Sequence, residues 1–105
     1  MVDMETIRQA VELLREAANP RKIILFGSYA RGDADDDSDV DLLVVEDDVP
    51  DVPTEMVRLM RVLAPLLIPA EVIVVGTEQF EQWSKLPGTI YTAAASEGET
   101  LYDAA

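Results

Sequence analysis

The sequence contains no cysteine and no histidine, and both absences restrict its chemistry. Without cysteine there are no disulfides and no thiolate metal sites, and without histidine there is no imidazole catalysis and no zinc site of the usual kind. Any chemistry must therefore use carboxylates, hydroxyls, arginine and lysine. Oxygen ligands alone favour Mg²⁺, Mn²⁺ or Ca²⁺ over softer metals.

Long apolar segments are also absent. No apolar run approaches the length of about 18 residues that a membrane-spanning helix needs, and no charged-then-apolar leader follows Met1. We therefore expect no membrane association and a cytoplasmic location. A chain of 105 residues can bury one core but is too short for a catalytic domain plus a separate recognition domain. We expect one domain that spans residues 1–105.

Basic side chains are scarce, with 8 Lys and Arg against 21 Asp and Glu, for a net charge of −13. This balance argues against a protein that binds a long nucleic acid directly. A small nucleotide that carries its own magnesium remains compatible, because the ion cancels much of the local repulsion. The same charge also fits high solubility, a salt-adapted proteome or a basic partner subunit.

Apolar periodicity and turn residues predict an alternation of helices and strands that is typical of an α/β or α+β domain. Asp3 and Asp51 are predicted helix caps, and Gly98 is predicted to cap the last helix. In chain order we expect a helix from Asp3 to Ala18, a strand Lys22–Phe26, a short helix Ser28–Gly32, a strand Asp39–Val45, a helix from Asp51 to Leu67, a strand Ala70–Val75, a short helix from Gly76-Thr77, a helix Thr89–Glu97 and an extended segment Thr100–Tyr102.

Two predicted helices carry apolar side chains whose place in the fold decides how they are interpreted. The face of the helix after Asp51 is predicted to contain Met56, Val57, Met60, Leu63 and Leu67. Four aromatic residues suggest a shelf for an adenine ring: Phe80, Trp83, Tyr91 and Tyr102. Because Phe80 and Trp83 are at helical spacing, we interpret them as core or subunit contacts and do not assign these aromatics to a ligand.

Two motifs beside predicted strands carry the chemistry. Gly27-Ser28 ends the first strand, where glycine lets the backbone turn and leaves amides available for phosphate. After ten intervening residues, Asp39 and Asp41 flank Val40, and side chains two apart on a strand point to the same face. Two like charges at such a short separation repel one another. A bound divalent metal ion would neutralise this repulsion.

These motifs resemble the signature of the nucleotidyltransferases related to DNA polymerase β. The run Gly27–Gly32, followed by Ser38–Val44, is similar to the minimal nucleotidyltransferase branch, which consists of the catalytic core alone. The resemblance continues through Ala70–Val75, Thr77–Phe80 and Glu97–Tyr102, so that it covers nearly the whole chain. It implies a mixed β-sheet flanked by helices.

The resemblance also implies roles for individual residues. Gly27 and Ser28 are expected to contact the β- and γ-phosphates of a nucleoside triphosphate, and Arg31 is a further expected phosphate contact. Asp39 and Asp41 are the expected ligands of two Mg²⁺ ions, with Mn²⁺ as an alternative. Glu71 matches the third family carboxylate, which binds the catalytic metal and helps deprotonate the acceptor hydroxyl. Aspartate is commoner at that position.

The implied reaction transfers a nucleoside monophosphate, AMP from ATP, to a hydroxyl on another molecule. Proteins of this branch are often paired with a HEPN-domain ribonuclease in a toxin–antitoxin system, and some adenylylate a tyrosine of that partner. The resemblance thus implies a HEPN-domain partner, and a homodimer is a further possible assembly. We also retain two other functions, a binding module that neutralises its partner by contact and an enzyme that modifies a small molecule such as an aminoglycoside.

The acidic run offers a different metal site. Positions 1, 3, 5, 7 and 12 of a calcium loop correspond to Asp35, Asp37, Asp39, Asp41 and Glu46. Position 6 of such a loop is normally glycine but is Val40 here, and a β-rich run follows where an EF-hand has a helix. These features argue against an EF-hand.

Overall fold

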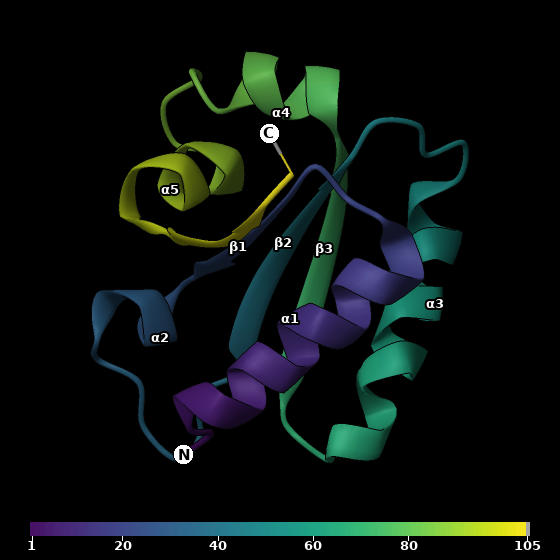
Figure 1. Ribbon diagram of the computed structural model, residues 1–105. Coiled ribbons are helices and arrows are strands. Elements are labelled where there is room, and N and C mark those ends of the chain that lie inside the picture. Colours follow the sequence, from purple (N-terminus) through teal and green to yellow (C-terminus); the bar gives the residue numbers. More distant parts are fainter. Residues whose placement is uncertain (105) are drawn as a thin grey trace.

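The computed structural model describes residues 1–104, which form one mixed sheet with helices on both faces (Figure 1). In chain order the elements are α1 (Met4–Ala18), β1 (Lys22–Phe26), α2 (Ser28–Arg31), β2 (Val40–Glu46), α3 (Val52–Leu63), the 3₁₀ turn η1 (Ala64–Leu66), β3 (Ala70–Gly76), α4 (Thr77–Trp83), α5 (Ile90–Glu97) and β4 (Glu99–Asp103). Within this range no helix is both long and apolar enough to cross a bilayer.

The four strands lie in the order β3-β2-β1-β4. β1 pairs antiparallel with both β2 and β4, whereas β2 and β3 run parallel. A parallel pair needs a crossover connection, and α3 supplies it. The central strands β1 and β2 are nearly continuous runs of Ile, Leu, Val and Phe because both of their faces are buried.

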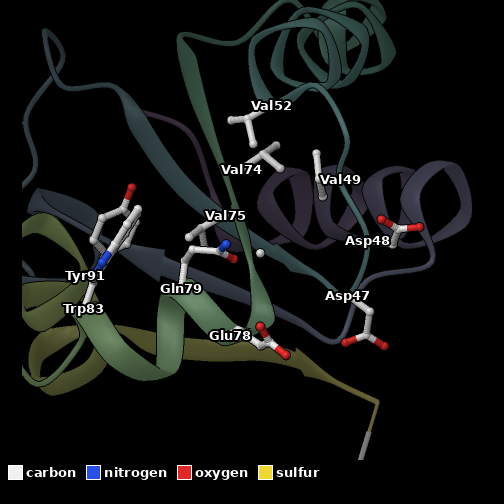
Figure 2. Close-up of a pocket in the computed structure, with 11 residues that line it drawn as sticks. Asp47, Asp48, Val49, Val52, Val74, Val75, Glu78, Gln79, Trp83 and Tyr91 are labelled. Atoms are coloured by element: carbon white, nitrogen blue, oxygen red, sulfur yellow. The ribbon is translucent and has the colours of Figure 1, made fainter.

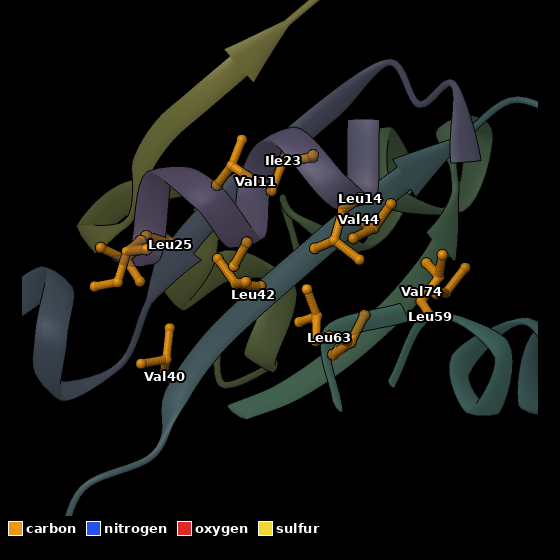
Figure 3. Close-up of a cluster of buried hydrophobic side chains, with 13 residues drawn as sticks. Val11, Leu14, Ile23, Leu25, Val40, Leu42, Val44, Leu59, Leu63 and Val74 are labelled. Atoms are coloured by element: carbon orange, nitrogen blue, oxygen red, sulfur yellow. The ribbon is translucent and has the colours of Figure 1, made fainter. Parts of the chain in front are cut away.

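The main core lies between the sheet and the helices α1 and α3 (Figures 1 and 3). Alternate residues of β2, Val40, Leu42 and Val44, point into it and are completely buried. Each such side chain contributes about 1.5–3 kcal/mol by leaving water. The intervening residues Leu43 and Val45 face a smaller core under α4 and α5. The alternation therefore assigns each strand position to one of two faces.

Side-chain caps fix where three helices begin. Asp3 accepts a hydrogen bond from the Thr6 amide at 2.8 Å, and Asp51 accepts one from the Thr54 amide at 3.2 Å, as the sequence predicted. Thr89 caps α5 in the same way. Each cap is worth about 1 kcal/mol.

Two sequence predictions about the bounds of strands need correction. Asp39 lies one residue before β2, outside the strand. The terminal segment is a full strand, β4, that pairs with β1. Gly98 is the C-cap of α5, as predicted, although with φ −74° and not in the left-handed conformation. Glycine is needed there because a β-carbon would collide with the Ala94 carbonyl oxygen and the Ile24 side chain.

The predicted apolar face of α3 is rotated from the observed one. Leu59 and Leu63 are buried against the sheet, with Met56 partly buried beside them. Val57 and Met60 are exposed instead. The helix ends at Leu63, and Leu67, 92% exposed, lies beyond η1 in the left-handed conformation. Two neighbouring sides of α3 are apolar, so periodicity alone did not identify the buried one.

Candidate active site

The glycine turn that was singled out from the sequence connects β1 to α2. Gly27 has φ 71° and ψ −153°, a region that is open essentially only to glycine. Its carbonyl oxygen accepts hydrogen bonds from the amides of Ala30 and Arg31, which closes the single turn of α2. Gly32 ends this turn in the left-handed conformation. The backbone thus reverses between Gly27 and Gly32, with Ser28 as the first residue of α2.

Asp41 lies directly against this turn. In the antiparallel ladder it is opposite Phe26, the residue before Gly27. A β-carbon built on Gly27 would overlap Asp41 Oδ2, so only a hydrogen atom fits between the backbone and the carboxylate. Glycine is therefore required at position 27 by the backbone conformation and by the close contact with Asp41.

Glu71 is the register partner of Asp41 in the parallel ladder between β2 and β3. Directly paired residues of neighbouring strands project to the same face of a sheet. Val40, Leu42, Val72 and Val74 fill the core under α1 and α3, so Asp41 and Glu71 project to the opposite face. The predicted convergence of these two carboxylates on one face is consistent with this register.

The electrostatics show that the acidic groups are close enough to act on one another. The pKa of Asp41 is raised, first because the carboxyl is partly buried and then because the charges of Glu71 and Asp39 repel a charge on it. Arg31 acts in the opposite direction and lowers the pKa. Asp41 therefore lies close to two other carboxylates, Asp39 and Glu71, and to the Arg31 guanidinium.

Arg31 and Ser28 are placed near this acidic group but do not contact it through a hydrogen bond. The Arg31 guanidinium forms an ion pair with Asp33, with Nε 3.3 Å from Oδ2, and remains 48% exposed. An exposed ion pair of this kind is worth about 1 kcal/mol or less, so a phosphate can compete for the guanidinium. Ser28 is partly buried at the start of α2.

The donor set suits a hard divalent cation, although the site is not a complete protein cage. Within residues 1–104, no three acidic side chains gather closely enough to form a metal centre by themselves. Mg²⁺ typically binds one or two carboxylates together with substrate phosphates. Asp41, with Asp39 and Glu71 beside it, fits that pattern, because the phosphates of a nucleotide at Gly27 would complete the ligand set.

The calcium-loop alternative does not fit the structure. Asp35 and Ser38 form a small turn in which Asp35 Oδ1 accepts from the Asp37 amide at 2.9 Å. The chain then enters β2 at Val40 and stays extended through Glu46. Positions 6 to 12 of the supposed loop are thus strand, whereas an EF-hand needs a turn followed by a helix.

The aromatic residues lie away from the acidic group. Phe80 packs against the smaller core, as predicted. Trp83 and Tyr91 contact one another with ring centroids 5.3 Å apart and form one wall of a cavity of about 550 Å³ (Figure 2). Sequence reasoning missed this cavity, because its other residues come from the loop after β2, the start of α3, the end of β3 and α4, with no motif to connect them.

Comparison with known proteins agrees with the fold and the motifs. The family model of the nucleotidyltransferase domain matches residues 7–91. A Methanocaldococcus jannaschii protein, named as a candidate protein adenylyltransferase, is 34% identical over 104 residues that cover 97% of this chain and 100% of the relative. The protein adenylyltransferase MntA of Thermococcus cleftensis is 44% identical over 54 residues, which cover 51% of this chain and 54% of MntA.

A solved structure shares the fold. The complex of a tri-AMPylated HEPN toxin with an MNT antitoxin from Shewanella oneidensis contains a chain that aligns with a TM-score of 0.60 and 22% identity, over 94% of this chain and 71% of the other. The mixed sheet flanked by helices, expected from the sequence, is thereby confirmed. The full-length relative and the family match together show that this chain belongs to the nucleotidyltransferase-domain family of enzymes, in which its curated relatives are named protein adenylyltransferases.

Proposed function

We propose that this chain transfers AMP from ATP to a hydroxyl group of a HEPN-domain partner protein, with the help of divalent metal, and acts as the antitoxin of that pair. The observation that carries the proposal is the contact between the Gly27 turn and the Asp41 carboxylate, with Glu71 paired beside Asp41. This arrangement juxtaposes a phosphate-binding backbone and acidic metal ligands. The Shewanella oneidensis complex, whose name combines an AMPylated HEPN toxin with an MNT antitoxin, supports the choice of partner.

In this proposal the turn binds the triphosphate. The Gly27 backbone and the Ser28 hydroxyl contact the β- and γ-phosphates, because no side chain at residue 27 obstructs their approach. Arg31 exchanges its exposed ion pair with Asp33 for a phosphate oxygen. The chain's own groups thereby fix the orientation of the nucleotide, which is the main protein contribution to reactions of this kind.

Asp39, Asp41 and Glu71 are the proposed metal ligands. Bound Mg²⁺, or Mn²⁺, would neutralise the phosphate charge and favour loss of pyrophosphate. Without the cation, burial and then the charges of Glu71 and Asp39 oppose ionisation of Asp41, and they raise its pKa in that order. Glu71 has a second proposed role, in which it accepts the proton of the acceptor hydroxyl.

The acceptor site is proposed to be completed by the partner. The surface has a net charge of −13, which suits a basic protein and disfavours a polynucleotide acceptor. A small-molecule acceptor such as an aminoglycoside is less favoured, because little chain remains outside the sheet and its helices to build a second pocket.

Mass spectrometry tests the proposal. The purified chain is incubated with ATP, MgCl₂ and its cognate HEPN-domain protein, and the partner should gain the mass of one or more AMP groups. Asp41→Asn should abolish the gain, and Glu81→Gln, an exposed acid one turn beyond Glu78 on α4, should not. An unmodified partner in a verified complex would contradict the transferase.

Neutralisation by contact alone is the second candidate, and one residue favours it. Glu71 occupies a position where the family more often has aspartate, and its extra methylene changes the position of the carboxylate. A contact antitoxin predicts that Asp39→Ala/Asp41→Ala still suppresses partner toxicity and still forms the complex. Loss of suppression with retention of the complex would favour the transferase instead.

A further inference from the structure

A cavity of about 550 Å³ lies at the end of the sheet remote from the Gly27 turn (Figure 2). Its volume is in the range of ordinary ligand pockets. Val49, Val52, Val74 and Val75 provide apolar lining, and Trp83 and Tyr91 stand together at one side. Trp83 is 40% exposed, so part of its indole is open to an incoming group.

Carboxylates surround the same cavity. Asp47, Asp48 and Glu78 lie across it from the aromatic pair in Figure 2, and Gln79 adds an amide. Asp47 is already engaged, since it accepts from Thr77 Oγ1 at 2.8 Å and lies 3.6 Å from Arg21 Nε. Within the described chain, Asp48 and Glu78 form no side-chain hydrogen bond or ion pair. Two carboxylates are thus available to a ligand that also contacts the aromatic wall.

We propose that this cavity binds an arginine side chain of the partner protein and so serves as a docking site separate from the reacting groups. The apolar lining suits the three methylenes of arginine, the indole suits the flat face of its guanidinium, and Asp48 and Glu78 suit its five N–H donors. The strong negative charge of the whole chain makes a cationic occupant electrostatically complementary.

The geometry favours guanidinium over ammonium. A guanidinium is planar and weakly hydrated, so its flat face suits an aromatic side chain and its N–H groups suit carboxylates. Ammonium is a compact and strongly hydrated charge that gains less from the aromatic wall. The cavity therefore predicts discrimination between arginine and lysine.

The docking site extends around the edge strand β3, with Val74 on the face that packs against α3 and Val75 on the face that carries the proposed active site. Val75, which lines the cavity, is four residues beyond Glu71 on β3, a separation of about 13 Å along the strand. One partner can therefore span both sites. The assignment of the arginine to an acceptor protein rests on the proposed function, whereas the ability of the cavity to bind a guanidinium does not.

NMR titration of the chain alone, without nucleotide or metal, tests the cavity. Trp83 is the only tryptophan, so its indole N–H gives one signal in a ¹H–¹⁵N spectrum. N-acetyl-arginine amide should shift this signal in a saturable way. The uncharged citrulline analogue and N-acetyl-lysine amide should bind at least about fivefold more weakly, which corresponds to about 1 kcal/mol.

Matched variants separate the cavity from the general charge. Glu78→Gln and Asp48→Asn should each weaken arginine binding about tenfold, the expected loss of one charge-assisted hydrogen bond. Glu81→Gln on the same helix and the exposed loop variant Asp37→Asn remove the same charge elsewhere and should leave binding unchanged.

Three results would overturn the proposal: a shift that does not saturate, equal binding of the citrulline or lysine probe, or equal loss in the control variants. Circular dichroism verifies the fold of each variant. If Glu78→Gln weakens α4, Asp48→Asn in the loop after β2 still decides the outcome. None of these measurements depends on AMP transfer, so failure of the docking site and failure of the transferase are distinguishable.

Discussion

Gly27 and Asp41 are in such close contact that the glycine hydrogen is the only group that fits between the turn and the carboxylate. The antiparallel pairing of Phe26 with Asp41 brings them together. A sheet register thus connects two motifs that are separated by a loop of polar residues. The spacing between the motifs matters because it allows β1 and β2 to pair in this register.

Gly27→Ala should therefore damage the proposed site in two ways. The φ of 71° is unfavourable for alanine, with a cost of about 1–3 kcal/mol, and the new methyl group would displace Asp41. We expect AMP transfer to fall about 100-fold, as for other displacements of about 1 Å among reacting groups. Urea unfolding and transfer rates measure the two effects.

Gly88→Ala provides the matched control for this substitution. Gly88 has φ 81°, but a β-carbon there meets no atom within 4 Å. The control should lose stability through backbone strain and keep its transfer rate. A loss of activity equal to that of Gly27→Ala would show that strain alone, and not contact with Asp41, explains the effect.

Removal of the charge on Asp41 should separate stability from activity. In metal-free buffer Asp41→Asn relieves repulsion by Asp39 and Glu71, so the melting temperature should equal or exceed that of the parent chain. Millimolar Mg²⁺ with ATP should raise the melting temperature of the parent chain and fail to raise that of the variant. Thermal melts with and without EDTA measure both. A variant that Mg²⁺ and ATP stabilise as much as the parent would exclude Asp41 as a ligand.

Glu71 is suited to a paired comparison of charge and length. Glu71→Gln removes the carboxylate opposite Asp41 and should reduce transfer about 100-fold or more, the usual contribution of a general base. Glu71→Asp keeps the carboxylate on a side chain one methylene shorter and should retain activity within about tenfold. The dependence of the transfer rate on pH is informative as well. Loss of a general base should also remove the fall in rate at low pH that the base causes. Full activity of Glu71→Gln would show that Glu71 neither binds metal nor accepts the proton.

The fold was largely predictable because its strands and caps have strong local signals. Lys22–Phe26 was predicted with the observed bounds, and Asp3 and Asp51 cap the expected helices. β4 was underestimated because its five residues, Glu99–Asp103, are partly polar and become a strand only by pairing with β1. Such pairing joins two segments that are far apart in the sequence and has no local signature.

The candidate site was predictable only where a motif marks it. Gly27 and Asp41 are marked by their spacing, but the pairing of Glu71 with Asp41 depends on the parallel register between β2 and β3. The roles of all these residues remain predictions. The cavity beside Trp83 had no such mark, since Asp48 and Glu78 belong to different elements that meet only in the folded chain.

Glu46 presents a separate electrostatic feature, at the end of β2 that is remote from Gly27. Only 7% of this residue is exposed, and no donor within the described chain reaches its Oε2 atom. Burial, and then a hydrogen bond to the facing Glu55 carboxyl, raise the pKa of Glu46 from 4.5 to about 8. Two carboxyls can share a hydrogen bond only when one is protonated, and the raised pKa of Glu46 beside the lowered pKa of Glu55 favours Glu46 as the protonated partner. Glu55 stays ionised because Arg58 Nε lies 2.6 Å from Glu55 Oε1 and donates a hydrogen bond that lowers the pKa of Glu55.

The raised pKa of Glu46 predicts how stability depends on pH. Between about pH 4.5 and 8 the folded chain holds a proton that the unfolded chain releases, so the free energy of unfolding should fall as pH rises through this range. The lowered pKa of Glu55 acts in the opposite direction, but only at lower pH, where its carboxyl begins to protonate. Glu46→Gln keeps a donor towards Glu55 and cannot ionise. The variant should match the parent near pH 5 and exceed its stability at pH 9, on the order of 1–3 kcal/mol.

Urea unfolding at pH 5, 7 and 9 would measure this difference, with Glu81→Gln as a control that should follow the parent. An unchanged pH slope in Glu46→Gln would mean that the parent carboxyl is already ionised at neutral pH. The Arg58 guanidinium would then have to balance the buried Glu46 and the partly buried Glu55, and Arg58→Met would be far more destabilising at pH 9 than at pH 5. A protonated Glu46 predicts a nearly constant effect of Arg58→Met between pH 5 and 7, because Glu55 is then the only charge that Arg58 must neutralise.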